Sequence, residues 1–231
     1  MIDLDWYLAH AGRREHLASV LAVQELLTPD SSLAPWLDNV TAAFRDNRAY
    51  WDLACSLRML AVEMKPERYL EIGVRRGKSM AQVAAAVPDC RLYGFDMWID
   101  PYGGVPNPGP EFVRGELGRV GYRGDAVFTI GASSETLPVF FAAHPGLDFS
   151  LITVDGDHSA AGAERDLELV GQRLAPGGFL LFDDLVLCRS ELGPVWESFQ
   201  RRRPDWQFAE NLRDHNGTGI AYRPSGSSAT L

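Results

Sequence analysis

Cysteine is scarce in this sequence, and long apolar runs are absent. Three cysteines, Cys55, Cys90 and Cys188, stand among 231 residues at spacings that fit neither a disulfide framework nor a zinc site. An odd, scattered set of cysteines is typical of a protein kept in the reducing cytoplasm. No stretch approaches the ~20 consecutive apolar residues of a membrane-spanning helix, and the acidic start from Met1 to Trp6 lacks the basic segment of a signal peptide. We therefore expect a cytoplasmic protein that does not enter a membrane.

Basic residues are also in the minority. The chain holds 22 Lys and Arg against 31 Asp and Glu, which gives a formal net charge of −9. Such a charge disfavours broad contact with nucleic acid or with an anionic membrane surface. The dense basic run from Arg201 to Arg203 is typical of a solvated helix end. We expect a small-molecule partner rather than a nucleic acid or a membrane.

The sequence pattern changes near residue 65. Before that point, apolar residues at helical spacing predict N-terminal helices around residues 17–23 and 53–64. Beyond it, short apolar runs alternate with helical patterns, which predicts a doubly wound, mostly parallel α/β sheet. The expected strands are residues 68–72, 92–96, 126–130, 149–154, 178–182, 206–209 and 219–222, and the expected helices lie near 79–86, 135–143, 160–174 and 194–201. We expect one domain, with a helical extension at 1–65, the α/β part at 66–223 and a disordered tail at 224–231.

A loop rich in proline and glycine interrupts this alternation at residues 100–110. Long loops inside compact domains are often lids or binding loops. The alternative is a passive insertion, and the sequence leaves both interpretations open.

Carboxylates follow two of the expected strands. Asp155 comes directly after residues 149–154, and Asp183 and Asp184 come directly after 178–182. The carboxyl ends of parallel strands share the sheet edge where α/β proteins bind ligands. Aspartate is also common in helix caps and turns. Because all three stand at strand ends, the pattern favours a site for a hard divalent cation.

A glycine-containing turn follows the first expected strand. Gly73 would allow a tight turn with close approach of the backbone to a ligand, and Gly77 would let the next helix start near the strand. This is not the dinucleotide pattern, since Arg75 occupies the place of the middle glycine. Asp96 ends the second strand, where a carboxylate can accept hydrogen bonds from ribose hydroxyls. Together these residues indicate a nucleoside site.

Small residues end the third expected strand. Gly131, Ala132 and Ser133 would leave space for a flat base, and Ser133 adds a hydroxyl. Ser133 is also suited to cap the following helix. Both roles stay open.

The order of these motifs resembles that of class I S-adenosylmethionine-dependent methyltransferases, over about residues 65 to 222. Within that class it looks like the metal-dependent small-molecule O-methyltransferases, both the catechol and caffeoyl-CoA type and the branch with macrocin-type and cephalosporin-hydroxylase-like proteins. The motifs that carry the resemblance are Leu70-Glu71-Ile72-Gly73, Gly94-Phe95-Asp96, Gly131-Ala132-Ser133, Asp155-Gly156-Asp157-His158 and Pro176-Gly177-Gly178.

The resemblance implies a Rossmann-like seven-stranded sheet with an antiparallel last strand. It implies S-adenosylmethionine and Mg²⁺, or another divalent cation, as cofactors. The expected reaction is methyl transfer to a hydroxyl of a small molecule, such as a natural-product intermediate. A hydroxylase-like or other enzyme on the same scaffold, or a non-catalytic S-adenosylmethionine-binding protein, are the alternatives.

The resemblance also implies roles for the residues near the cofactor. Glu71 and Gly73 would line its methionine portion, with Gly77 at the start of the following helix, and Asp96 would hold the ribose. The adenine would be bordered by Ala132 and Ser133 and covered by Met97 or Trp98.

The resemblance places the metal at Asp155, Asp183 and Asp184, with Asp155 also beside the cofactor. His158 is a candidate base, because an imidazole titrates near neutral pH. Asp157 is the rival candidate, since the sugar-type branch is thought to use a carboxylate there, although it could equally cap the next helix. The sequence does not decide between these two neighbours.

The acceptor pocket is expected between the sheet edge, the loop at 100–110 and the N-terminal helices. Tyr102, Trp98 and Trp6 could supply aromatic walls, although aromatic residues at such spacings usually belong to the core. In sugar-type relatives the N-terminal segment can contribute to oligomerisation, so a homo-oligomer is expected here.

Overall fold

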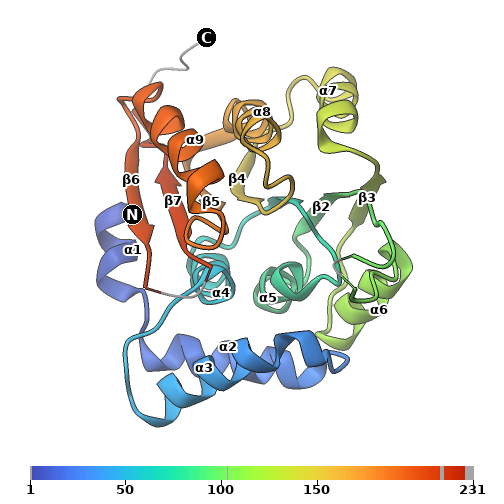
Figure 1. Cartoon of the computed structure of the whole chain (residues 1–231), viewed down its shortest axis with the longest axis vertical. Helices are drawn as coiled ribbons and strands as arrows, with labels where there is room; N and C mark the ends of the chain where they lie inside the picture. The colour runs from blue at the N-terminus through green and yellow to red at the C-terminus, as the bar shows by residue number, and fades with distance from the viewer. Residues whose placement is uncertain (1, 103, 214–215, 227–231) are drawn as a thin grey trace.

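The computed structural model describes residues 2–102, 104–213 and 216–226, and it contains the expected seven-stranded sheet (Figure 1). The strand order is β3-β2-β1-β4-β5-β7-β6. Strands β1 to β5 pair in parallel, whereas β7 runs antiparallel to both of its neighbours. The strands are β1 Arg68–Ile72, β2 Arg91–Asp96, β3 Ala126–Ile130, β4 Phe149–Val154, β5 Leu174–Phe182, β6 Gln207–Asn211 and β7 Thr218–Tyr222. The predicted Rossmann-like fold with a reversed last strand is confirmed.

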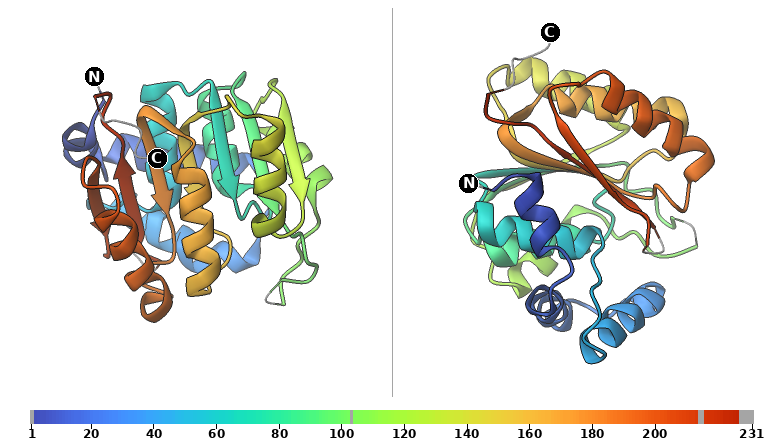
Figure 2. Two further views of the ribbon diagram at one scale, coloured as in Figure 1. Left: turned by 90° about the horizontal axis from the view of Figure 1, so that it is seen from above. Right: turned by 90° about the vertical axis from the view of Figure 1, so that its left-hand side faces the viewer.

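Helices cover both faces of this sheet (Figure 2). Alternate residues along each strand face opposite sides, as a pleated strand requires. Tyr69 belongs to the core shared with α1, α4, α5 and α6, while the next residue, Leu70, belongs to the core shared with α7, α8 and α9. The helices are α1 Leu4–His10, α2 Arg14–Leu26, α3 Ala34–Arg45, α4 Leu53–Met64, α5 Lys78–Ala86, α6 Pro110–Arg119, α7 Ser133–Ala143, α8 Ala160–Gly171 and α9 Arg189–Arg201, with a 3₁₀ turn η1 at Ser31–Leu33. The sheet is therefore a buried layer between two helical layers.

The N-terminal helices α2 and α3 form a further layer outside α4 (Figure 1). Leu17 and Val20 of α2 and Val40 of α3 are fully buried against the outer side of α4. This arrangement carries residues 30–54 across the carboxyl end of β1. The N-terminal segment thus lies where a ligand of the sheet edge would bind.

Several elements differ from the sequence-based expectation, among them α6, α9 and β5, which begins at Leu174 rather than at residue 178. No element was expected at residues 111–119, but α6 occupies them, because Pro110 is tolerated in a first helical turn and Val113 and Leu117 supply a buried face. Helix α9 begins at Arg189, earlier than expected, with Pro194 inside it. Most of the tail expected at 224–231 lies outside the described residues. Within the described part of the chain, no helix is long and apolar enough to cross a membrane.

Candidate functional site

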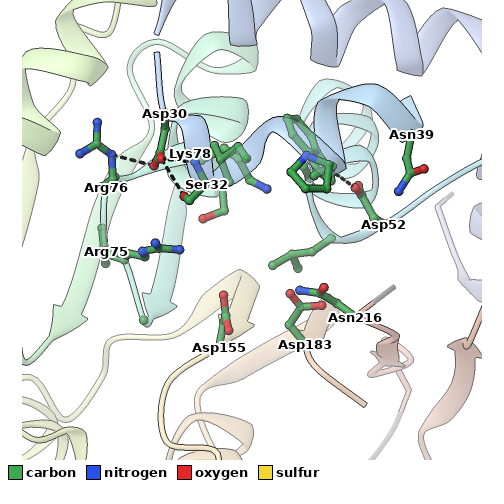
Figure 3. Close-up of a pocket in the computed structure, with 18 of the residues that line it drawn as sticks. Asp30, Ser32, Asn39, Asp52, Arg75, Arg76, Lys78, Asp155, Asp183 and Asn216 are labelled. Carbon is green, nitrogen blue, oxygen red and sulfur yellow. Dashed lines mark hydrogen bonds and ion pairs between the residues drawn. The ribbon is translucent and has the colours of Figure 1, made fainter. Parts of the chain in front are cut away.

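A cavity of about 450 Å³ opens at the carboxyl ends of the central strands (Figure 3). Its sheet side includes Gly73 and Arg75 after β1, Asp155 after β4 and Asp183 after β5. Its other side comes from the N-terminal segment. There the wall includes Asp30, Ser32, Trp36, Tyr50 and Asp52. The cavity therefore lies between the predicted sheet edge and the N-terminal helices.

The aromatic walls of this cavity differ from the prediction. Trp36 and Tyr50 line it, whereas Trp6, Trp98 and Tyr102 do not. Trp6 instead stacks on a histidine of its own helix with ring centroids 4.2 Å apart, and Trp98 packs edge-on against Phe128. The Pro/Gly loop at residues 100–110 contributes no lining residue among those described. The described residues of the loop therefore do not line this cavity, and the role of the loop at an acceptor pocket stays a prediction.

Trp36 is held in place by polar and cationic contacts. Its indole N–H donates to the carboxylate of Asp52, which also accepts from the Tyr50 hydroxyl at 3.2 Å and caps α4. The ammonium of Lys78 lies 4.0 Å from the centroid of the Trp36 ring. Arg76 forms an ion pair with Asp30 at 2.9 Å. These contacts join the N-terminal segment to the turn after β1, and no local sequence pattern predicts them.

The turn after β1 passes unusually close to the end of β4. Gly73 has a φ of +87°, and a Cβ built on it would lie 1.7 Å from the carbonyl oxygen of Asp155. No side chain fits there, so glycine at this position lets the turn pack against the end of β4, and Gly73 also lines the cavity floor. Close approach of the Gly73 backbone to a ligand stays a prediction. Gly77 has a different role, because its Cβ would meet Val113 of α6 at 2.7 Å. Gly77 thus permits packing of α5 against α6 and does not line the cavity.

Glu71 lies fully buried beneath this floor. Its carboxylate accepts a hydrogen bond from the Tyr69 hydroxyl at 2.9 Å and another from the Ser79 hydroxyl. Burial raises the pKa of Glu71 to about 8, against the opposing effect of these two hydrogen bonds. Ser79, in the first turn of α5, stands between Glu71 and the cavity and lines the latter. Sequence reasoning missed Ser79, although its position two residues after Gly77 is a usable signal.

Asp96 organises the loops beside the cavity. Its carboxylate accepts from the backbone N–H of Arg75 at 2.7 Å and from that of Trp98 at 2.6 Å. Asp96 itself is not part of the cavity lining, and Met97 is 53% exposed. Each carboxylate oxygen can accept a further hydrogen bond. Ribose binding by Asp96, with Met97 or Trp98 over the base, therefore stays a prediction.

Ser133 begins α7 but does not cap it. Ala132 occupies the capping position, without a side-chain hydrogen bond. The Ser133 hydroxyl and the Asp157 backbone lie near Asp166, a buried carboxylate of α8, and both lower its pKa. Burial dominates and raises the pKa of Asp166 to about 6. The capping interpretation of Ser133 is wrong, and the adenine-bordering role of Ala132 and Ser133 stays a prediction.

Asp155, His158 and Asp184 form a cluster that could hold a metal ion. Each offers one ligand atom, and these atoms all lie within 4.8 Å of one another. The Nε2 atom of His158 lies 3.1 Å from Asp184 and 3.7 Å from Asp155. The carboxylate of Asp155, and more weakly the charge of Asp184, raise the pKa of His158 against the opposing effect of burial. Two carboxylates and an imidazole are a suitable donor set for a divalent cation.

Asp183 and Asp157 take other positions. Asp183 points into the cavity (Figure 3), and its carboxylate accepts from the Thr218 hydroxyl at 3.2 Å. Asp157 accepts from the Ser159 backbone N–H at 2.8 Å, but the cap of α8 is Ser159, whose hydroxyl accepts from the Gly162 N–H, so the capping interpretation of Asp157 is wrong. Metal binding by Asp155, Asp183 and Asp184 stays a prediction, and His158 is a further candidate ligand that the predicted set lacks.

Comparison with known proteins gives this arrangement a family. The model of a methyltransferase-domain family matches residues 70–185. A curated relative, the 8-demethyl-8-(2,3-dimethoxy-alpha-L-rhamnosyl)-tetracenomycin-C 4'-O-methyltransferase of Streptomyces olivaceus, is 28% identical over 155 residues, which cover 66% of this chain and 54% of that protein. The chain thus spans about half the length of this relative.

Solved structures share the fold at low sequence identity. The O-methyltransferase TomG from Streptomyces achromogenes, in complex with SAM, has a TM-score of 0.59 and 19% identity over 90% of this chain and 96% of its own. An O-methyltransferase from Bacillus cereus in complex with SAH has a TM-score of 0.57 and 16% identity over 89% and 97%. The family match covers the strands and turns that build the cavity floor and the acidic cluster. The chain belongs to this methyltransferase family, of the class I, S-adenosylmethionine-dependent type.

Proposed function

We propose that this protein transfers a methyl group from S-adenosylmethionine to a hydroxyl of a small molecule, with assistance from a divalent cation. One observation carries the proposal: the glycine floor at Gly73 and the cluster of Asp155, His158 and Asp184 meet at one sheet edge. A Cβ on Gly73 would collide with the backbone of Asp155, so glycine lets the end of β1 approach the end of β4 at this edge. A cofactor and a metal ion would therefore stand side by side there.

Such a pairing suits the chemistry of methyl transfer to a hydroxyl. S-adenosylmethionine supplies an electrophilic methyl group on a sulfonium. A hydroxyl is a weak nucleophile at neutral pH, so its proton must be taken up and its developing charge stabilised. Asp155 and Asp184 would hold the cation, and Gly73 and Ser79 would border the methionine portion of the cofactor. The N-terminal segment would cover the cavity and limit the access of water.

Two assignments of His158 are compatible with the proposal. If Asp155, Asp183 and Asp184 hold the cation, the imidazole of His158 is available as the base. If His158 is itself a ligand, Asp157 is the remaining candidate base, although its hydrogen bond to the start of α8 engages one of its oxygens. We favour His158 as the base, because an imidazole beside two carboxylates is held in one orientation and can accept a proton near neutral pH.

The acceptor is proposed to be a hydroxylated natural-product intermediate or its sugar. Support comes from the curated relative, whose name describes methylation of a rhamnosyl group. The Trp36 and Tyr50 side chains could pack against such a ring. We also propose a homo-oligomer, which light scattering of the purified protein tests directly.

The test is a labelled-methyl transfer assay on a panel of phenolic and sugar acceptors. We expect activity that EDTA abolishes and excess Mg²⁺ restores, and that Asp155→Ala removes. Asp89→Ala is the matched control, because Asp89 is an exposed carboxylate paired with Arg123. Transfer that withstands both EDTA and Asp155→Ala would exclude the metal. Binding of S-adenosylhomocysteine without turnover on any acceptor would favour a binding protein instead.

A further inference from the structure

Arg75 has a backbone conformation that residues other than glycine usually avoid. Its φ is +50°, in the left-handed region. Two contacts fix it there: its N–H donates to Asp96 at 2.7 Å, and its carbonyl oxygen accepts from the Trp98 indole at 3.0 Å. Glycine would satisfy this backbone with less strain. The protein therefore keeps a strained backbone conformation at a position that carries a charged side chain. Backbone strain of this kind is found mainly at functional sites.

The side chain of Arg75 reaches into the cavity. Figure 3 shows its guanidinium between the N-terminal segment and Asp155. Its Nε atom is buried and, among the described residues, has no hydrogen-bond partner. Buried donors in folded proteins are almost always paired, so this atom calls for an acceptor.

The neighbouring cations are already engaged. Arg76 pairs with Asp30 at 2.9 Å, and Lys78 lies over the ring of Trp36. Within residues 2–102, 104–213 and 216–226, no ion pair of the Arg75 guanidinium with a carboxylate is found at 4.0 Å or less. Among the cationic side chains of the cavity, Arg75 is thus the one best placed to bind an anionic group of a ligand.

We propose that Arg75 binds an anionic group, a carboxylate or phosphate, of a molecule that occupies the cavity. The planar guanidinium matches such groups with two parallel hydrogen bonds. The inference rests on the proposed function, which supplies two possible sources of the anion. One is the methionine carboxylate of the cofactor, and the other is an acidic group on the acceptor.

Isothermal calorimetry on Arg75→Met separates these sources. S-adenosylhomocysteine carries the amino-acid end, whereas 5′-methylthioadenosine lacks it. If Arg75 binds the cofactor, Arg75→Met weakens binding of S-adenosylhomocysteine at least about ten-fold. Binding of 5′-methylthioadenosine then stays within about two-fold of the wild-type affinity. If Arg75 binds the acceptor, both are retained, but binding of inorganic pyrophosphate to the protein saturated with S-adenosylhomocysteine weakens by a similar factor.

Two further variants serve as controls for this experiment. Arg123→Met removes the same charge from an exposed residue paired with Asp89 and should change none of the three affinities. Arg75→Lys keeps the charge without the planar fork and should restore part of the binding. The proposal is overturned if Arg75→Met leaves all three ligands within about two-fold of the wild type. If the wild-type protein itself does not bind S-adenosylhomocysteine, the proposed function fails, and this result is distinct from failure at Arg75 alone.

Discussion

Gly73→Ala is the substitution that tests the cavity floor most directly. A Cβ at this position would stand 1.7 Å from the carbonyl oxygen of Asp155 and 2.4 Å from its carbonyl carbon. Both are backbone atoms at the end of β4, so no side chain can rotate to make room. The ends of β1 and β4 would have to separate, and the same movement would displace the Asp155 carboxylate.

The magnitude follows from two contributions. Placing alanine in the left-handed region costs about 1–2 kcal/mol. Forcing a methyl group into a filled space adds about 1–3 kcal/mol. We therefore expect Gly73→Ala to lower the free energy of unfolding by about 2–5 kcal/mol, a large part of the ~5–15 kcal/mol typical of a folded domain.

A matched control separates the two contributions. Gly121 has a φ of +79°, and a Cβ built on it meets no atom within 4 Å. Gly121→Ala should therefore show only the conformational cost, about 1–2 kcal/mol. Urea unfolding of both variants measures the difference, and calorimetry with S-adenosylhomocysteine measures the loss of binding in Gly73→Ala alone. Equal destabilisation of the two variants would refute the close approach of β1 and β4.

Two other predictions concern titratable groups near the site. Because burial raises the pKa of Asp166 to about 6, the folded state binds more protons than the unfolded state between about pH 4 and 6, so stability falls as pH rises through that window. Asp166→Asn should remove up to about 3 kcal/mol of this decrease in the free energy of unfolding. Urea unfolding from pH 4 to 7 measures it, and parallel pH profiles for variant and wild type would contradict the prediction. His158→Ala should abolish methyl transfer while leaving Mg²⁺ affinity within about ten-fold if His158 is the base. Loss of Mg²⁺ binding in calorimetry would instead make His158 a ligand.

Strand positions and strand-end residues could be predicted because they depend on local pattern. Buried parallel strands read as short apolar runs, and whatever follows them must lie at one edge of the sheet. Gly73, Asp155 and Asp183 accordingly line one cavity. The same logic extends to Asp184, which lies within reach of Asp155.

The N-terminal wall could not be predicted, since it depends on contacts between distant segments. A helical pattern indicates that a helix has a buried face, but it does not say against which element that face packs. Trp36 meets Lys78 across more than forty residues of sequence, and Asp52 meets Trp36 through a turn with no motif of its own. Likewise, only the folded chain shows that His158 lies nearer to Asp184 than to Asp155.

Asp96 illustrates how a predicted ligand residue can have a structural task as well. Its carboxylate holds the N–H of Arg75 and the N–H of Trp98, so it fixes the backbone from which the Arg75 side chain enters the cavity. Trp98 closes the same loop by donating to the Arg75 carbonyl. A ribose bound to the remaining lone pairs of Asp96 would therefore share its anchor with the proposed anion-binding residue. Binding of a ribose at Asp96, beside the cavity, and of an anion by Arg75 inside it would then be coupled through one carboxylate, because Asp96 holds the Arg75 backbone N–H.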